Sequence, residues 1–229
     1  GFLVNTGSRL VLIDTGARGA MPSAGKLVNV LRDAGVTPDQ IDDVIITHAH
    51  PDHAGGLVDE GGMRVFPQAN IRISREDMDF WYDENAKKQM RQKEQMFDFA
   101  QKLLGPYKNS GQINTFRLGE DIGNGISSVA LPGHTPGHSG VRISDGRDQL
   151  LIWADIVHVP ALQFANPAQS IGFDIDPDMA RETRKKIFDE VATDKIRVAG
   201  MHLCFPGIGH LAKSGDGYDF VEQIFETTL

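Results

Sequence analysis

The stretch that decides the fold is residues 46–56, which read ITHAHPDHAGG and hold three histidines and one aspartate within six consecutive positions. They follow an apolar run that predicts a short buried strand. Because residues two apart in an extended segment point the same way, His48 and His50 can chelate one metal ion. A proline then turns the chain, so that Asp52 and His53 can face a second ion. The stretch therefore predicts metal binding.

The other histidines also lie just past apolar, strand-like runs. None of the eight histidines lies in residues 1–47 or in residues 75–104. Strand ends are where an α/β fold assembles a site from distant segments. Imidazole plus carboxylate suits Zn²⁺ and its borderline neighbours better than Ca²⁺ or Mg²⁺, and Asp14 could orient one of the imidazoles. The histidines fall in four groups, each just past an apolar, strand-like run: 46–53, 133–138, 155–158 and 202–210.

Length, charge and cysteine content limit the class of protein. At 229 residues, one well-filled domain is expected. The net charge of −8 and the lack of a basic stripe argue against a nucleic-acid partner, and the cluster at 184–186 (RKK) is predicted to be a solvated helix face. The single cysteine, Cys204, allows no intrachain disulfide and leaves the compartment open, cytoplasmic or periplasmic. No apolar stretch is long enough to span a bilayer, so a soluble chain without a membrane partner is expected.

The order of strand-like and helical runs predicts a layered α/β sandwich in two similar halves. In the first half we expect a hairpin, a helix and two further strands, at 2–4 with 10–13, 27–31, 44–47 and 71–74. In the second half we expect a helix capped by Asp176 at 177–191, a strand or helix at 218–225, and strands at 113–118, 126–131, 140–143, 150–153 and 196–199.

Residues 75–104 differ in character from the rest. Apolar side chains are scattered through a charged segment without glycine or proline, which predicts two helices ended by Gly105-Pro106. The pair is predicted to form a cap, with Phe80 and Trp81 lining a substrate pocket together with Phe164. Apolar walls around a few polar groups suit a small, neutral, hydrophobic substrate. The same cap could instead bury its apolar face against a second copy of the chain in a homodimer.

In these motifs the chain resembles the metallo-β-lactamase-fold hydrolases. Their signature is H-x-H-x-D-H followed by separate His, Asp and His ligands, and here IDTG at 13–16 and LPGHTPGH at 131–138 accompany it in the same order. The resemblance covers nearly the whole chain. It implies a single four-layer αββα sandwich domain over 1–229, with the helical cap at about 75–104 and the site at the strand ends. A strand usually precedes the position where this chain starts, so an upstream strand is expected to complete the first sheet.

Within that superfamily the second half is most similar to methyl parathion hydrolases. The similar stretches are WADIVHV at 153–159, GFDIDP at 172–177 and FPGIGH at 205–210. Quorum-quenching N-acyl-homoserine lactonases are the next relatives and share GHTPGH at 133–138. The resemblance therefore implies an enzyme of the lactonase, esterase or phosphotriesterase type.

The resemblance also implies seven metal ligands for two divalent ions. Zinc is the expected metal, with manganese, cobalt or iron as alternatives. Two positions depart from the relatives: Ala154 stands where glycine is frequent, and His158 stands where homoserine lactonases carry a catalytic tyrosine. The second departure favours the methyl parathion hydrolase branch. By position, one metal would be held by His48, His50 and His134, the other by Asp52, His53 and His202, with Asp155 bridging both.

The predicted activity is hydrolysis of lactones, esters or organophosphate triesters. A metal-bridging hydroxide would be the nucleophile, since bound metal lowers the pKa of water to about 7. Asp52 would shuttle the proton and Asp155 would hold both ions. His138, His158 and His210 are predicted to support the metal ligands or to line the pocket. Glyoxalase II-like thioester hydrolysis and a mononuclear-iron persulfide dioxygenase are the alternatives, whereas a class B β-lactamase would often have cysteine at the bridging position.

Overall fold

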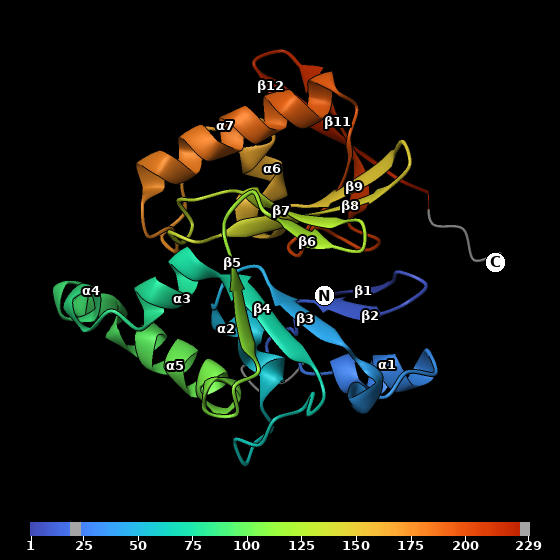
Figure 1. Ribbon diagram of the computed structural model, residues 1–229. Coiled ribbons are helices and arrows are strands. Elements are labelled where there is room, and N and C mark those ends of the chain that lie inside the picture. Colours follow the sequence, from blue (N-terminus) through green and yellow to red (C-terminus); the bar gives the residue numbers. More distant parts are fainter. Residues whose placement is uncertain (19–23, 225–229) are drawn as a thin grey trace. The chain divides into compact units, whose positions relative to one another are not determined.

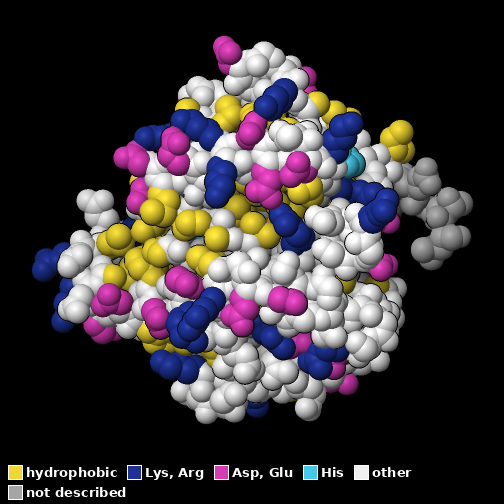
Figure 2. Space-filling model, turned by 45° about the horizontal axis from the view of Figure 1, so that its top comes forward, with side chains coloured by type: hydrophobic (Ala, Val, Ile, Leu, Met, Phe, Trp, Pro, Cys, Tyr) yellow, Lys and Arg dark blue, Asp and Glu magenta, His cyan; other side chains and the backbone are white. Residues whose placement is uncertain are grey.

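The computed structural model describes residues 1–18 and 24–224, and the chain divides into two compact units, Gly1–Arg117 and Leu118–Leu229. Each unit contains one β-sheet with helices beside it (Figure 1). On the face drawn in Figure 2, basic and acidic side chains are interspersed, in agreement with the absence of a basic stripe in the sequence. Among the described residues, no helix combines the length and the apolar character that crossing a bilayer requires.

The first unit is built on a five-stranded sheet in the order β1-β2-β3-β4-β5. β1 and β2 form the predicted antiparallel hairpin, while β2 to β5 run parallel. Parallel strands are usually covered on both faces, which explains the unbroken apolar runs of β2 and β3. The strands predicted for the first half are confirmed, but the strand predicted at 113–118 in the second half belongs to this first sheet instead. The five strands are β1 (Phe2–Asn5), β2 (Leu10–Ile13), β3 (Asp43–Ile46), β4 (Asn70–Ser74) and β5 (Ile113–Phe116).

Helical segments connect these strands. They are α1 (Leu27–Asp33), η1 (Pro38–Gln40), α2 (Pro51–Ala54), η2 (Gly55–Leu57), α3 (Arg75–Trp81), α4 (Glu84–Gln89), η3 (Arg91–Lys93) and α5 (Glu94–Asn109). The prediction of two helices in residues 75–104 is wrong, since α3, α4, η3 and α5 all begin there. The expectation that Gly105-Pro106 ends the last helix is also wrong, because α5 continues through both residues. Proline removes one helical N–H donor. The neighbouring side chains of Leu103, Leu104 and Tyr107 are nonetheless buried, and this tertiary packing outweighs the lost hydrogen bond.

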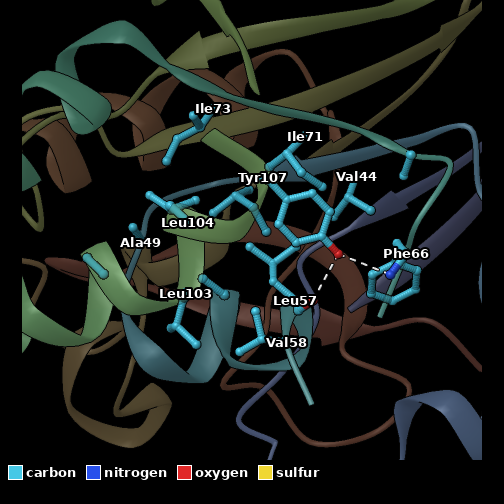
Figure 3. Close-up of a cluster of buried hydrophobic side chains, with 14 of the residues drawn as sticks. Val44, Ala49, Leu57, Val58, Phe66, Ile71, Ile73, Leu103, Leu104 and Tyr107 are labelled. Atoms are coloured by element: carbon cyan, nitrogen blue, oxygen red, sulfur yellow. Dashed lines mark hydrogen bonds between the residues drawn. The ribbon is translucent and has the colours of Figure 1, made fainter. Parts of the chain in front are cut away.

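Tyr107 anchors the core of the first unit (Figure 3). Its hydroxyl donates to the carbonyl of Leu57 at 2.9 Å and accepts from the N–H of Phe66 at 3.0 Å. Both partners follow the histidine loop in the chain, so α5 fixes where that loop ends. Burial raises the pKa of Tyr107 to about 12, and the phenol therefore stays protonated and able to donate at neutral pH.

The second unit is built on a seven-stranded sheet in the order β12-β11-β10-β9-β8-β7-β6. Only β9 and β10 pair in parallel, and the chain between them contains η4 (Ala154–Ile156), α6 (Pro160–Gln163) and α7 (Pro177–Thr193). The strand bounds are β6 (Asp121–Gly123), β7 (Ile126–Ala130), β8 (Ser139–Asp145), β9 (Asp148–Ile152), β10 (Arg197–Ala199), β11 (Ile208–Ser214) and β12 (Gly217–Glu222).

Two strands of this sheet were not predicted, and one ambiguous segment is resolved. β6 is three residues long and β11 begins within the last histidine group, so neither carries a strong alternating pattern. The segment predicted at 218–225 as strand or helix forms part of the strand β12 up to Glu222, and Phe225 lies outside the described residues. The long pairing between β11 and β12 stabilises both strands through backbone hydrogen bonds that sequence periodicity does not reveal.

α7 confirms one prediction and corrects another. Asp176 caps it by accepting the N–H of Met179 at 3.0 Å, as expected. The cluster at 184–186 is only partly a solvated face: Lys185 and Lys186 are exposed, but Arg184 is 1% exposed. Arg184 lies on the same side of the helix as the apolar residues that pack on the sheet, and that position buries it.

Replacing Tyr107 by Phe tests the anchor in the first unit. The variant keeps the buried ring but removes the hydroxyl that bonds Leu57 and Phe66, so we expect the free energy of unfolding to fall by about 1–3 kcal/mol. Urea denaturation measures this change. The half-buried Tyr82 provides a matched control, for which Tyr82→Phe should cost less than about 0.5 kcal/mol. Equal losses in the two variants would contradict the anchoring role of Tyr107.

Candidate metal centre

The histidine loop of the first unit changes backbone conformation halfway. His50 is extended, with φ −70° and ψ 153°, and α2 starts at the next residue, Pro51. Proline is well suited to the first position of a helix because its missing N–H has no helical partner there. His48 and His50 therefore leave the extended segment, whereas Asp52 and His53 leave the first helical turn. This change separates four closely spaced side chains into two pairs.

His48 and His50 form the first pair. Nε2 of His48 lies 3.0 Å from Nδ1 of His50, and both rings are buried. Two imidazole nitrogens bound to one tetrahedral zinc ion are about 3.3 Å apart. Nδ1 of His48 lies 3.1 Å from the hydroxyl of Thr47, which directs Nε2 toward His50. The pair thus has the spacing and orientation of two ligands to one divalent ion.

Asp52 and His53 form the second pair. Oδ2 of Asp52 lies 3.5 Å from Nε2 of His53. On the far side of the ring, Nδ1 of His53 lies 2.7 Å from Oδ2 of Asp14. A carboxylate on the second nitrogen of a metal-binding imidazole holds the ring in one orientation and raises its basicity. Asp14 therefore orients His53, in the role that its position after β2 suggested.

In the second unit Asp155 gathers three imidazoles. Asp155 is 2% exposed and lies in η4, just after β9. Its Oδ2 is 2.8 Å from Nε2 of His158, 3.1 Å from Nε2 of His202 and 3.4 Å from Nε2 of His134. The structure of this unit therefore brings together the three ligands predicted from its sequence and adds His158. His134, Asp155 and His158 also lie close enough together to hold one ion.

Two side chains support these ligands from behind. Nδ1 of His134 lies 2.9 Å from Oδ1 of Asp174, the same arrangement as Asp14 with His53. His138 donates through Nδ1 to the carbonyl of Leu131 at 2.8 Å and accepts the N–H of Asp155 at Nε2, 3.2 Å away. Both nitrogens of His138 are used in this way, so it positions the backbone of Asp155. Burial raises the pKa of Asp174, and the Arg184 guanidinium acts in the opposite direction.

Arg184 and Gln163 hold the backbone that carries the second ligand set. Arg184 donates through Nε to the carbonyl of Ile156 at 2.6 Å and through Nη1 to two further loop carbonyls. Gln163 is fully buried and accepts the N–H groups of His158 and Val159 at 2.7 and 3.0 Å. Sequence reasoning missed both residues, since arginine and glutamine in helices are usually exposed. Only their burial in the folded unit reveals the role.

Ala154, directly before Asp155, has a left-handed backbone with φ 48°. In this region a Cβ crowds the following carbonyl, at a cost of about 1 kcal/mol that glycine avoids. This conformation explains why related proteins often have glycine at the position. The methyl group is accommodated, but in a strained backbone next to Asp155.

The residues predicted to line a substrate pocket have different surroundings. In the first unit Trp81 is fully buried, with Phe80 packed against it at a ring-centroid distance of 4.8 Å. In the second unit His158 lies beside Asp155, and Phe164 belongs to the apolar core with Trp153, Phe188 and Phe220. His210 lines a polar cavity of about 520 Å³ together with Arg142, Arg147, Asp148, Gln149, Glu190, Asp194, Lys195, Ile196 and Arg197. Their roles toward a substrate stay predictions.

The match to a known family covers most of the chain. The model of the metallo-beta-lactamase superfamily matches residues 2–200, a span that includes every predicted metal ligand except His202. The chain therefore belongs to the metallo-β-lactamase superfamily. Its two sheets, with helices beside each of them, have the α/β architecture of that fold.

Two solved structures resemble the chain over nearly its whole length. A hydrolase of the β-lactamase superfamily, AbOPH, is 34% identical with a TM-score of 0.92, over 98% of this chain and 79% of that one. AidC, a dizinc quorum-quenching lactonase solved in complex with a product, is 31% identical with a TM-score of 0.90, over the same shares of the two chains.

Curated relatives are more distant and longer. An N-acyl homoserine lactonase of Bacillus thuringiensis is 25% identical over 177 residues, which are 76% of this chain and 61% of the lactonase. Two mycobacterial relatives are 24% identical over 67% of this chain and 55% of their own length. The chain thus spans less than two thirds of these relatives.

Replacing Ala154 by Gly tests the strained backbone before Asp155. Relief of the left-handed strain should offset the lost methyl burial and the added freedom of the unfolded chain, so we expect the free energy of unfolding to change by less than about 1 kcal/mol. Ala100→Gly is the matched control, because Ala100 is equally buried but helical, and it should cost about 2 kcal/mol. Chemical denaturation measures both variants. A loss in Ala154→Gly as large as the control would contradict the strain.

Proposed function

We propose that the chain is a dinuclear metal-dependent hydrolase of lactones, esters or organophosphate triesters. The observation that carries the proposal is the pairing of donors in residues 48–53, with His48 against His50 and Asp52 against His53. One peptide segment thus presents two separate chelating pairs. The imidazoles of His48 and His53 are held at their second nitrogens by the oxygens of Thr47 and Asp14, as metal-binding histidines usually are.

The ligands of the two units are proposed to share two ions. Zinc is the proposed metal, supported by the donor chemistry and by a dizinc relative at 31% identity. One ion would be held by His48, His50 and His134, the other by Asp52, His53 and His202, with Asp155 shared between them.

Asp52 and Asp155 are proposed to have different chemical roles. Divalent ions bound to this donor set would supply hydroxide at neutral pH and polarise the substrate oxygen. The side chain of Asp52 is 40% exposed, against 2% for its partner His53, so it can exchange a proton with a leaving group. The carboxylate of Asp155 is buried among three imidazoles and holds its position. Asp52 is therefore the proposed proton shuttle and Asp155 the proposed shared ligand.

The surroundings of His158 within the second unit support a neutral, hydrophobic substrate. The Phe173 ring lies 6.5 Å from the His158 ring and is 63% exposed. Val159 and Leu162 add exposed apolar surface next to η4. Apolar groups around a few polar ones suit a substrate that carries a hydrophobic chain. Lactones and esters are the first candidates, because AidC is a lactonase, and phosphotriesters are the second.

Metal analysis and a small substrate panel test the proposal. The wild-type chain should bind two equivalents of zinc and hydrolyse at least one of a medium-chain acyl lactone, a p-nitrophenyl ester and a paraoxon-like triester. His50→Ala and Asp155→Ala should lose at least one equivalent of metal and the hydrolysis, because each removes a ligand. Asp145→Ala, at an exposed position on β8, is the control.

Three outcomes would contradict the proposal. If His50→Ala or Asp155→Ala kept both its turnover and its full metal content, the replaced residue would not be a metal ligand that the reaction requires. A single iron with consumption of oxygen would instead support the persulfide dioxygenase. Hydrolysis of thioesters alone would support the glyoxalase II-like activity.

A homodimer through the helices at 75–109 is a separate proposal. Phe99 on α5 is 49% exposed and gives this segment an apolar surface that a second copy of the chain could cover. Light scattering on the wild-type chain should then report twice the mass of one chain, and Phe99→Glu should shift it toward the monomer. A monomeric mass for the wild type would contradict this proposal.

A further inference from the structure

We propose that Asp77 and Trp81 on α3 are positioning residues for the His48–His50 pair. The inference rests on the proposed function, because it concerns the metal that this pair would hold. Through these two residues α3 contacts the histidine loop directly. α3 lies in the segment predicted to cap the substrate.

The Asp77 carboxylate binds the backbone between the two histidines. Asp77 is fully buried, and its Oδ2 accepts the N–H of Ala49 at 2.8 Å. Ala49 stands between His48 and His50, so this bond fixes the peptide from which both imidazoles extend. A hydrogen bond to a charged acceptor is shorter and stronger than one between neutral groups. The spacing of the two ligand nitrogens therefore depends on where Asp77 holds Ala49.

Trp81 locks Asp77 and packs against His50. Its indole N–H donates to the same Oδ2 of Asp77 at 2.9 Å. The two residues are four apart on α3, which places their side chains on one face of the helix. The Trp81 ring is fully buried and meets the His50 ring edge-on, with centroids 5.5 Å apart and planes at 64°. Trp81 thus restrains both the carboxylate that holds the loop and one of the rings that the loop carries.

The start of α3 is itself fixed beside the loop. Ser74, the last residue of β4, accepts the N–H of Asp77 at 3.1 Å and caps the helix. β4 pairs in parallel with β3, and Ile73 lies opposite Ile46 in the register. α3 and the histidine loop therefore leave adjacent strands at the same end of the sheet, which brings Asp77 to Ala49.

The opposite side of Trp81 is held by α5. Phe97 packs against the Trp81 ring at a centroid distance of 5.0 Å, and Gln101 donates to the carbonyl of Trp81 at 2.9 Å. A buried tryptophan with both ring and backbone restrained leaves little freedom for its partner. The helices at 75–109 therefore act as a support for the first ligand pair, whatever they contribute to substrate binding.

The test compares metal affinity in four purified variants. Asp77→Ala removes the acceptor, Asp77→Asn replaces the carboxylate by an amide, and Trp81→Phe keeps a ring but removes the indole N–H. Asp79→Asn is the matched control, since Asp79 is exposed on the same helix. Zinc content, competition with a chelator and thermal stability of the metal-free protein are measured for each.

We expect Asp77→Ala to weaken one of the two zinc equivalents by about 10- to 100-fold while the other keeps its affinity. Asp77→Asn and Trp81→Phe should weaken the same equivalent to a smaller extent, and Asp79→Asn should leave both unchanged. The visible spectrum of the cobalt-substituted protein should change for one ion only. A merely structural role would lower metal-free stability and affect both equivalents alike.

Unchanged affinity for both equivalents in the Asp77 variants would overturn the inference, and so would an equal loss at both. If Asp77→Ala does not fold, Asp77→Asn and Trp81→Phe decide the question by the same criteria. Failure of the proposed function looks different, because the wild-type chain would then take up no metal or would bind metal without hydrolysing the panel.

Discussion

The carboxylate of Asp14 is the constraint on which the first ligand set depends. It stands at the end of β2 and accepts both the N–H and the hydroxyl of Thr47 at 2.8 Å, just after β3. It also lies against Nδ1 of His53 in α2. One buried side chain thus fixes a strand end, a loop and a helix together. Asp14 has a left-handed backbone with φ 57°, a strain of about 1–3 kcal/mol that its several charged hydrogen bonds can offset.

In the second unit, other side chains orient the proposed ligands. Asp174 stands behind His134 as Asp14 stands behind His53. The backbone around Asp155 is held separately, by His138 at its N–H and by Arg184 at the following carbonyl. Donor side chains that are already held in place lose less entropy when an ion binds than freely rotating side chains do. The conformational entropy of these side chains is lost during folding, and buried hydrogen bonds in each unit offset that loss.

Local sequence patterns predicted most of the elements. The hairpin, the parallel strands of the first sheet and the capped helix α7 follow from apolar runs and from Asp176. The errors arise where packing overrides a local signal. Pro106 is expected to end a helix. α5 continues past it because buried residues lie on the same face of the helix before and after the proline. Arg184 was predicted to lie on a solvated helix face. It is instead buried, and backbone carbonyls accept hydrogen bonds from its guanidinium.

The sequence by itself determined the two pairs of donor side chains, because residues within one short segment are related by backbone geometry alone. His48 with His50, and Asp52 with His53, could be predicted from an extended segment followed by a proline. Apart from Asp14, which the sequence already suggested, only the tertiary structure decided which side chains hold those residues. Asp77 is 28 residues from Ala49 and Asp174 is 40 residues from His134. A carboxylate gains such a role only when distant strands and helices bury it beside its partner, and no local pattern in the sequence records that burial.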